Sequence, residues 1–139
     1  MDKRNFIHGN TIPVKNYCDQ PYMIRTDDDA WLLSVTTGPA NEGDPGQHII
    51  TMRTTDRGKS WTDLNDLEPD EGPMASYSAF CKTPAGRIYC FYNHNTDNVH
   101  DLVVDEKGTI KHRRLDLVGH FVFRYSDDHG RSWSEKRYD

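Results

Sequence analysis

Two acidic residues lie close together in a loop whose composition suits a polar site. The loop runs from Thr37 to Gln47, is rich in Gly, Pro and Asn, and carries Glu42 and Asp44. A carboxyl group that is partly shielded and lies near another acid can have a raised pKa, which suits it to donating a proton. The other interpretation is that both residues are ordinary loop acids beside a turn.

A second polar group follows directly after an apolar, aromatic run. Asn93, His94 and Asn95 carry amide and imidazole groups, which suit hydrogen bonds to sugar hydroxyls. The ring of Tyr77 or Tyr92 could stack on the face of a sugar. We therefore expect these three residues to bind substrate, and the alternative is a polar loop with a hydrated histidine.

The elements that must position these groups are organised by a repeated stretch of eight residues. Residues 54–61 are Thr-Thr-Asp-Arg-Gly-Lys-Ser-Trp, and residues 126–133 are Ser-Asp-Asp-His-Gly-Arg-Ser-Trp. Both fit the pattern [ST]-x-D-x-G-x-S-W, and each follows an apolar run. A repeat of this kind is stronger evidence than any single segment.

The pattern predicts a tight turn between two strands. In the first copy, the side chain of Asp56 can accept hydrogen bonds from the backbone of the turn. Gly58 can take a positive φ that a side chain would penalise, and Trp61 can begin the next strand and bury its ring. The corresponding residues of the second copy are Asp128, Gly130 and Trp133. The motif is therefore expected to stabilise a hairpin and to carry no chemistry.

Apolar and β-branched runs between turn signals predict an all-β chain with two sets of four antiparallel strands. Four short antiparallel strands are the content of one β-propeller blade. No segment of useful length has a helical period. The strands are expected at residues 21–25, 30–36, 48–53 and from 61 in the first set, and at 77–81, 87–92, 119–125 and from 133 in the second.

The two sets differ in length between their second and third strands. Trp31 and Ile88 are 57 residues apart, whereas Asp56 and Asp128 are 72 apart, so the second set carries 15 additional residues. We expect an added hairpin there, with strands at residues 102–105 and 109–111.

The repeated stretch resembles the Asp box, also called the bacterial neuraminidase repeat (BNR), of sialidases and their relatives. That box lies between the third and fourth strands of successive β-propeller blades. The resemblance implies one partial propeller domain over residues 1–139, with blade one at about 17–68 and blade two at about 74–139. It further implies the N-terminal part of a six-bladed sialidase-like propeller. An alternative is a small protein that closes its ring by self-association.

The resemblance also assigns site residues in the first blade. The proline and the Arg-Thr ending of Asp19–Thr26 match the first strand of sialidases, but their carboxylate-binding arginine falls on Asp19. A carboxylate repels the carboxylate of a sialic acid, so this substrate-binding position favours another sugar. The stretch Gly43–Gly46 corresponds to the one that carries the family's general acid/base. Asp44 is therefore the candidate catalytic residue, with Glu42 beside it.

Several site residues of the family fall outside this comparison. No arginine precedes Asp44 where sialidases place one. The family's nucleophile, a tyrosine assisted by a glutamate, comes from later blades. The chain by itself is thus expected to supply only part of a glycoside hydrolase site.

Composition excludes some classes of function. The chain has 139 residues and a net charge of −5, which gives no electrostatic reason to expect nucleic acid. The basic run at residues 111–114 is interpreted as a solvated edge. No Cys/His spacing is typical of zinc, and neither a metal nor another cofactor is expected. Cys81 and Cys90 fall on neighbouring predicted strands and are expected to be buried thiols, with a disulfide between them as the alternative.

No apolar run is long enough for a transmembrane helix, and the first residues lack the apolar core of a signal peptide. We expect no membrane partner. We expect a cytoplasmic protein from the sequence as written, or an exported one if an N-terminal signal has been removed.

The function predicted from the sequence is that of a sialidase-like, carbohydrate-active protein. The full protein is expected to be an exo-acting glycoside hydrolase on terminal sugars of glycans, with a glycan or small sugar as its partner. One alternative is a non-catalytic glycan-binding or scaffold propeller. Another is a propeller polysaccharide lyase, which would use His or Tyr instead of two acids.

Overall fold

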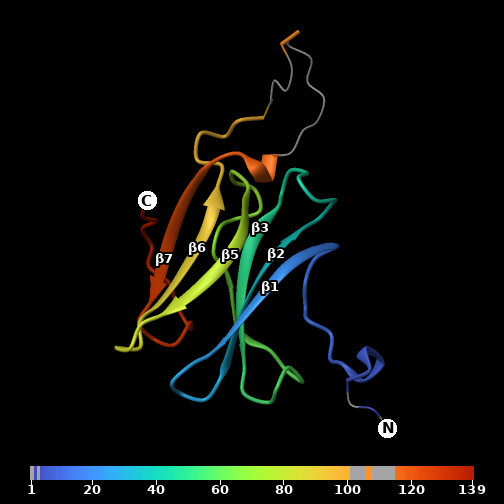
Figure 1. The fold of residues 1–139 in the computed structure, drawn as a ribbon, viewed down its shortest axis with the longest axis vertical. Helices are drawn as coiled ribbons and strands as arrows, with labels where there is room; N and C mark the ends of the chain where they lie inside the picture. The colour runs from blue at the N-terminus through green and yellow to red at the C-terminus, as the bar shows by residue number, and fades with distance from the viewer. Residues whose placement is uncertain (1, 3, 101–105, 108–114) are drawn as a thin grey trace.

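The fold consists of two antiparallel β-sheets (Figure 1). The computed structural model describes residue 2 and residues 4–100, 106–107 and 115–139. Within these residues the only helical segments are two short 3-10 turns, η1 (Phe6–His8) and η2 (Leu115–Leu117). The prediction of an all-β fold is confirmed.

The first sheet has its strands in chain order, β1-β2-β3-β4, and the second has the order β5-β6-β7. Each of these seven strands matches a strand predicted from the sequence. Strand β1 begins four residues earlier than expected. The bounds are β1 (Tyr17–Arg25), β2 (Trp31–Gly38), β3 (His48–Thr54), β4 (Thr62–Asp66), β5 (Ala75–Lys82), β6 (Ile88–His94) and β7 (His120–Ser126).

The predicted fourth strand of the second sheet is only partly formed. Tyr138 exchanges two backbone hydrogen bonds with Phe123 of β7, and Ser134 N–H donates to the carbonyl of Tyr125 at 2.8 Å. Between them the ladder is interrupted, because the Ser134 hydroxyl accepts from Tyr125 N–H and donates to the carbonyl of Lys136. The side chain therefore replaces a regular ladder bond.

The register confirms the offset between the two repeats. Trp31 pairs with Thr54 at the end of β3, and Ile88 pairs with Ser126 at the end of β7. The added residues thus lie between β6 and β7. The predicted extra hairpin strands (102–105 and 109–111) and the basic run at 111–114 lie outside the described residues.

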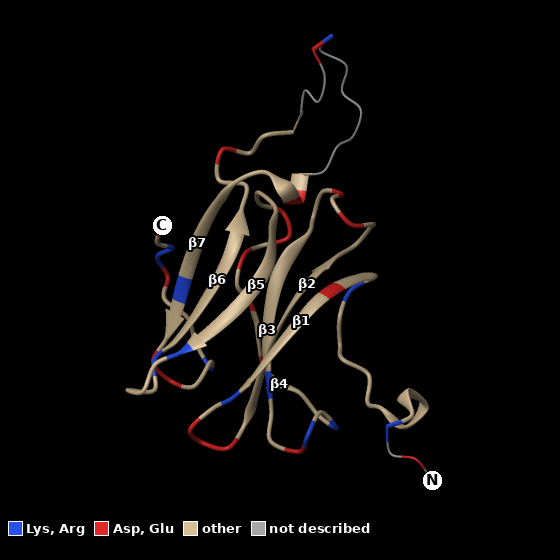
Figure 2. Cartoon of the chain, viewed as in Figure 1, with Lys and Arg blue, Asp and Glu red and all other residues tan. Residues whose placement is uncertain are grey.

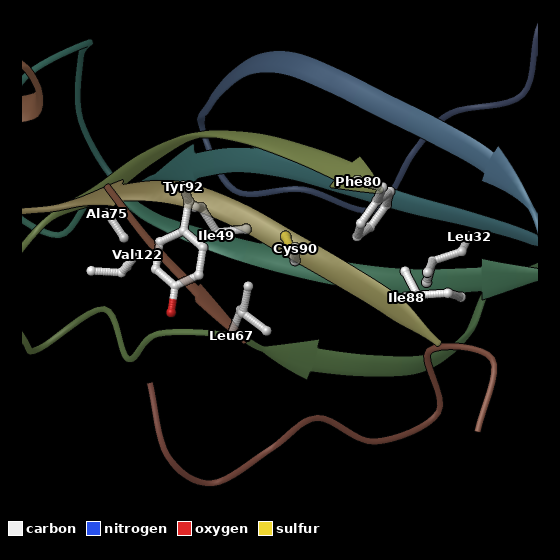
Figure 3. Packing of buried hydrophobic residues seen from close by; sticks show 9 residues of the cluster. All are labelled: Leu32, Ile49, Leu67, Ala75, Phe80, Ile88, Cys90, Tyr92 and Val122. Atoms are coloured by element: carbon white, nitrogen blue, oxygen red, sulfur yellow. The ribbon is translucent and has the colours of Figure 1, made fainter. Parts of the chain in front are cut away.

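The main hydrophobic core lies between the two sheets (Figure 3). Burial of one such side chain stabilises the fold by about 1.5–3 kcal/mol. The two sheets therefore depend on one shared interior. Its members are Leu32 and Ile49 from the first sheet, Leu67 from the linker, and Ala75, Phe80, Ile88, Cys90, Tyr92 and Val122 from the second sheet.

A second apolar cluster covers the opposite face of the first sheet. Ile12 and Val14 of the N-terminal segment and the ring of Trp61 pack against it. Strands β2 and β3 are consequently buried on both faces, which explains why apolar residues occupy adjacent positions in them, as in Leu32-Leu33 and Ile49-Ile50. The cluster consists of Leu33, Val35, Ile50 and Met52.

The first repeated turn has the predicted geometry. Asp56 accepts hydrogen bonds from the backbone N–H of Lys59 and Ser60, both at 2.9 Å, and from the Ser60 hydroxyl at 2.7 Å. The Thr54 hydroxyl donates to Asp56 and accepts from Gly58 N–H, where φ is +80°. The Asp56 carboxylate and the Thr54 hydroxyl together accept hydrogen bonds from the backbone N–H groups of Gly58, Lys59 and Ser60.

The second repeated turn reproduces this arrangement. The Ser132 hydroxyl donates to Asp128 at 2.6 Å, and Ser132 N–H donates to the same carboxylate at 2.9 Å. Gly130 N–H donates to the Ser126 hydroxyl at 2.8 Å, as Gly58 does in the first copy. Each copy of the motif thus closes, with its own side chains, the turn that follows β3 or β7.

Charged residues lie mostly in the loops and at the strand ends (Figure 2). Two acids of the β1–β2 turn join the sheets, because Asp27 pairs with Lys82 and Asp28 accepts from Arg131 at 2.5 Å. Asp28 also accepts from Arg53 of β3 at 2.6 Å. The turn that closes the first hairpin therefore holds the second sheet in place.

The cysteine prediction is half wrong. Cys81 and Cys90 lie on adjacent strands as free thiols, but only Cys90 is buried, because Cys81 points to the exposed face of β5.

In the described part of the chain, no helix is long and apolar enough to span a membrane.

Candidate functional site

The polar residues singled out in the sequence gather at the end of the sheets that is opposite the repeated turns. The repeated turns follow the last residues of β3 and β7, whereas the loop 39–47 and η2 lie at the other end (Figure 1). The start of β1 and the end of β6 also reach this end. Two repeats thus bring their corresponding loops to one surface.

Each sheet has a β-bulge in its first strand near this surface. In β1 the register shifts between Asp19 and Tyr22, and Gln20 has a φ of 48°. In β5 it shifts between Ser76 and Ala79, and Tyr77 has a φ of 60°. Bulges redirect side chains, and a non-glycine residue with positive φ is held there by its surroundings. The bulges are a tertiary feature that the strand prediction missed.

Asp19 lies in a small cluster of acids and phenols. The Tyr17 hydroxyl donates to Asp19 at 3.1 Å. Burial raises the pKa of Tyr17, and the nearby charges of Asp19 and Glu42 raise it further, with Tyr77 also close. The structure therefore brings Asp19 and Glu42, two of the predicted site residues, to one phenol.

Asp44 caps the loop that contains it. Its Oδ2 accepts hydrogen bonds from the backbone N–H and the side-chain amide of Asn41, both at 3.0 Å. The Gln47 side chain closes the same loop by accepting from Gly43 N–H at 2.8 Å. Asp44 is partly exposed, and Glu42 is exposed. The loop thus presents a fixed carboxyl group at the surface.

Tyr77 forms the second phenol–carboxylate pair of this surface. Its hydroxyl donates to the carboxylate of Asp116, a residue of η2 that is 1% exposed. The Asp116 carbonyl accepts from the Ser76 hydroxyl and from the Asn93 amide, each at 3.0 Å. Sequence reasoning missed Asp116, because no motif links it to Tyr77 across 39 residues.

The side chains of Asn93, His94 and Asn95 are engaged within the chain. The Asn93 amide donates to the carbonyls of Asp116 and Val118. Asn95 is 1% exposed and exchanges two hydrogen bonds with Val99. The three residues share the predicted surface, and their contact with a ligand stays a prediction.

His94 faces the interior. Its ring is buried, Nδ1 lies 2.9 Å from the Thr96 hydroxyl, and Nε2 lies 3.7 Å from a Glu68 carboxylate oxygen. Burial lowers the pKa of His94, although the charge of Glu68 acts against this. The imidazole is therefore biased towards its neutral form.

A buried cluster around Glu68 was not predicted. This residue follows β4, is 3% exposed, and accepts from the Tyr92 hydroxyl at 2.5 Å. Arg137 donates to both carboxylate oxygens at 3.0 Å, and Arg124 approaches at 3.4 Å. The two arginines also line an open recess of about 490 Å³ beside His120. No sequence signal marks Glu68, since its partners come from three distant segments.

Two conclusions follow for the chemistry of the site. Carboxylates and phenols can exchange protons and bind hydroxyl groups, and they disfavour an anionic ligand. Among the described residues, no group of three His, Cys, Asp or Glu side chains could hold a metal ion.

Comparison with known proteins identifies the fold. No protein-family model and no curated protein matches the chain. Among solved structures, a protein of unknown function from Dyadobacter fermentans DSM 18053 matches 87% of the chain, with a TM-score of 0.58 and 17% identity. The Hadza microbial sialidase Hz136 matches 82% with a TM-score of 0.56 and 17% identity, and another sialidase matches 84% with 0.58 and 18%.

The chain spans only 36%, 24% and 12% of the lengths of these three proteins, respectively. At such low identity the likeness shows the fold alone. The two sheets have the fold of β-propeller blades, as found in sialidases.

Proposed function

We propose that the chain is part of a sialidase-like β-propeller with two Asp boxes, whose whole protein is an exo-acting glycoside hydrolase. Its substrate would be a terminal sugar of a glycan. The observation that carries the proposal is the convergence of the loop 39–47 and Asp19 at the end opposite the repeated turns. A polar end built from corresponding loops of successive repeats is a suitable place for a ligand.

Asp44 is the proposed general acid/base. Its Oδ2 is held by Asn41, which fixes the carboxyl group and leaves Oδ1 for a substrate oxygen. Glu42, two residues away, would contact the substrate together with Asp19 and with Asn93, His94 and Asn95. Proton transfer by a positioned side chain contributes about 10²–10⁴-fold to a rate.

The charges of the surface favour a sugar without a carboxylate. Asp19 and Glu42 both lie near the Tyr17 hydroxyl, so an anionic group there would meet two carboxylates. Sugar hydroxyls can instead donate to the carboxylates and accept from the phenol.

A non-catalytic, glycan-binding propeller is the second candidate. It is favoured by the hydrogen bonds of Asn93 and Asn95, which are made to the chain itself. In that case the repeated turns would only hold hairpins together. A polysaccharide lyase is favoured instead by Tyr77, whose phenol is paired with the buried carboxylate of Asp116.

Turnover of a glycan by the whole protein tests the proposal. Asp44→Asn keeps an oxygen acceptor for Asn41 but removes the acid, and should lower turnover by about 10²-fold or more while binding is kept. Asn41→Ala is the matched control, because it removes the side-chain hydrogen bond to Asp44, keeps the backbone one and leaves the carboxyl group in place. Unchanged turnover in Asp44→Asn would remove Asp44 from the mechanism. An unsaturated product absorbing in the ultraviolet would identify a lyase.

A further inference from the structure

An open recess of about 490 Å³ lies between β7, the C-terminal segment and the turn that follows β6. Small-molecule sites have volumes of about 300–1,000 Å³, so the recess has room for a small ligand. Asp19, Glu42 and Asp44 are not among the described residues that line it. The recess is therefore separate from the residues proposed for hydrolysis.

Two arginines are the most buried charged residues that line the recess. The side chain of Arg124 is 20% exposed and that of Arg137 is 29% exposed, whereas Asp97, Glu135 and Asp139 are exposed. Partly buried charges are screened by water less than exposed ones. The two guanidinium groups, which we call the inner wall, therefore give the interior of the recess a positive potential. The three exposed carboxylates form its rim.

The buried acid behind the inner wall does not neutralise both arginines. Among the described residues, Glu68 is the only carboxylate that pairs with either of them, at 3.0 Å from Arg137 and 3.4 Å from Arg124. Burial raises the pKa of the Tyr92 phenol and lowers that of the His94 imidazole, so both rings are biased towards neutrality. One negative charge thus lies against two positive charges, which leaves an excess of one positive charge.

Both guanidinium groups also have unused donors. Arg137 donates to the two oxygens of Glu68 through Nη1, and its Nη2 and Nε make no hydrogen bond within the described residues. Arg124 donates from Nη1 to the carbonyl of Ser134 at 3.3 Å, and its buried Nε has no partner in the described part of the chain. The Nε and Nη2 donors of an arginine match the two oxygens of a carboxylate or a phosphate.

We propose that the recess binds the anionic group of a small ligand, a carboxylate or a phosphate, at Arg124 and Arg137. This inference goes beyond the proposed hydrolase and does not depend on it. The anion accepts hydrogen bonds from Nε and Nη2 of Arg137 and balances the positive charge that Glu68 leaves over. The surface around Asp19 and Glu42, in contrast, disfavours an anion.

The rim indicates the chemistry of the rest of the ligand. Asp97, Glu135 and Asp139 are exposed there, and the His120 ring lies 3.1 Å from the Asp97 carboxylate. A second anionic group at the rim would be repelled, whereas hydroxyl groups can donate to these carboxylates. The ligand that fits is therefore a compound with one anionic group and hydroxyl groups, such as a hydroxy acid or a polyol phosphate.

Isothermal titration calorimetry on the 139-residue chain tests the proposal with three probes. Glycerate carries a carboxylate, glycerol 3-phosphate carries a phosphate, and glycerol carries neither. At least one of the two anionic probes should bind with a Kd of about 1 mM or below, and glycerol should give no binding heat. The anionic probe that binds more tightly identifies the group that the recess accepts.

Three substitutions assign the binding to the recess. Arg137→Lys keeps a positive charge for Glu68 but loses the planar pair of donors, and should weaken binding about 10-fold. Arg25→Lys is the matched control, because Arg25 is an exposed arginine at the opposite end of the sheets, and it should leave the affinity unchanged. Glu135→Gln removes one rim carboxylate and should strengthen binding about 2-fold.

Three results would overturn the proposal. One is the absence of binding heat from both anionic probes at about 10 mM, and another is equal binding of glycerol. The third is an affinity that Arg137→Lys does not change, or that Arg25→Lys lowers equally. If circular dichroism shows that Arg137→Lys is unfolded, an unchanged affinity in Glu135→Gln has the same meaning. Glycan turnover is measured separately through Asp44→Asn, so the recess and the proposed hydrolase can fail independently.

Discussion

At the residue scale, the buried acid Glu68 joins three segments of the chain. Glu68 lies in the linker between the sheets, and its carboxylate is bound by Tyr92 and Arg137. A buried charge is tolerated only when it is paired and hydrogen-bonded. The linker is thereby fixed to both β6 and the C-terminal segment.

Replacing Glu68 should therefore destabilise the fold. Glu68→Gln keeps an oxygen for the Tyr92 hydroxyl but leaves the guanidinium of Arg137 without its partner, and it should cost about 3 kcal/mol. Urea unfolding measures this loss. Glu71→Gln, an exposed acid of the same linker, should change stability by less than about 0.5 kcal/mol. If both substitutions changed the stability equally, Glu68 would not hold the linker through Tyr92 and Arg137.

The repeated turns should make stability depend on acid pH. The hydrogen bond from the Ser60 hydroxyl, with further bonds from the Ser60 and Lys59 backbone and Thr54, lowers the pKa of Asp56 from 3.8 to about 2. A folded-state pKa below the unfolded one stabilises the fold above pH 3.8, and this contribution is lost as pH falls from about 4 to about 2.

Ser60→Ala removes the largest of these hydrogen bonds. We expect it to destabilise the chain at pH 7 and to lose most of that difference at pH 2, as measured by urea unfolding at both pH values. Ser132→Ala in the second turn serves as a replicate, because Asp128 has the same partners and also a lowered pKa. If the stability difference between Ser60→Ala and the unchanged chain did not depend on pH, the ionised Asp56 carboxylate would not be its cause.

At the element scale, the two repeated turns have the same internal bonds but different neighbours. The glycine has a φ of +80° at Gly58 and +85° at Gly130. A Cβ at Gly58 would come no closer than 3.4 Å to the Trp61 ring, whereas one at Gly130 would lie 2.6 Å from Leu32. Leu32 is part of the shared core, so the second turn is packed against the interior.

Alanine substitutions should separate these two contributions. Both Gly58→Ala and Gly130→Ala place a side chain at positive φ, which costs about 1–2 kcal/mol. Only Gly130→Ala also overpacks the core, which adds about 1–3 kcal/mol. Thermal or urea unfolding of the two variants measures the difference. If Gly58→Ala were the more destabilising, the described contact with Leu32 would be wrong.

At the scale of the whole molecule, the two sheets act as one folding unit. Their interior is shared, and Trp133 of the second repeat reaches back to Thr51 of the first while its ring stacks on Phe80 at 5.9 Å. Trp61, the equivalent residue, packs on the far face, and its buried indole N–H has no hydrogen-bond partner within the described residues. One tryptophan joins the sheets and the other does not.

Phenylalanine substitutions test this difference. Trp133→Phe loses a hydrogen bond between the sheets and should cost about 1 kcal/mol more than Trp61→Phe, which loses none. Both are measured by urea unfolding followed by circular dichroism. We expect a single transition in each variant, because neither sheet can lose the shared core alone. Two separate transitions for Trp133→Phe would show that the sheets unfold independently.

The sequence by itself determined the architecture, because the information that specifies it is local. An eight-residue turn contains its own hydrogen-bond partners, as Asp56 and Ser60 show. Alternation of side chains then defines each strand and its buried face. The residue spacing of Trp31 and Ile88 even located the insertion between β6 and β7.

Only the tertiary structure decided which polar residues meet. Tyr77 contacts Asp116 from 39 residues away, and Arg137 binds Glu68 from 69 residues away. Such pairings depend on how the two sheets pack, and no periodicity records them. The same packing engaged Asn93 and Asn95 within the chain, although their residue types alone suggested a ligand. The residue types show what a side chain can bind, but the packing of the two sheets determines which partner it binds.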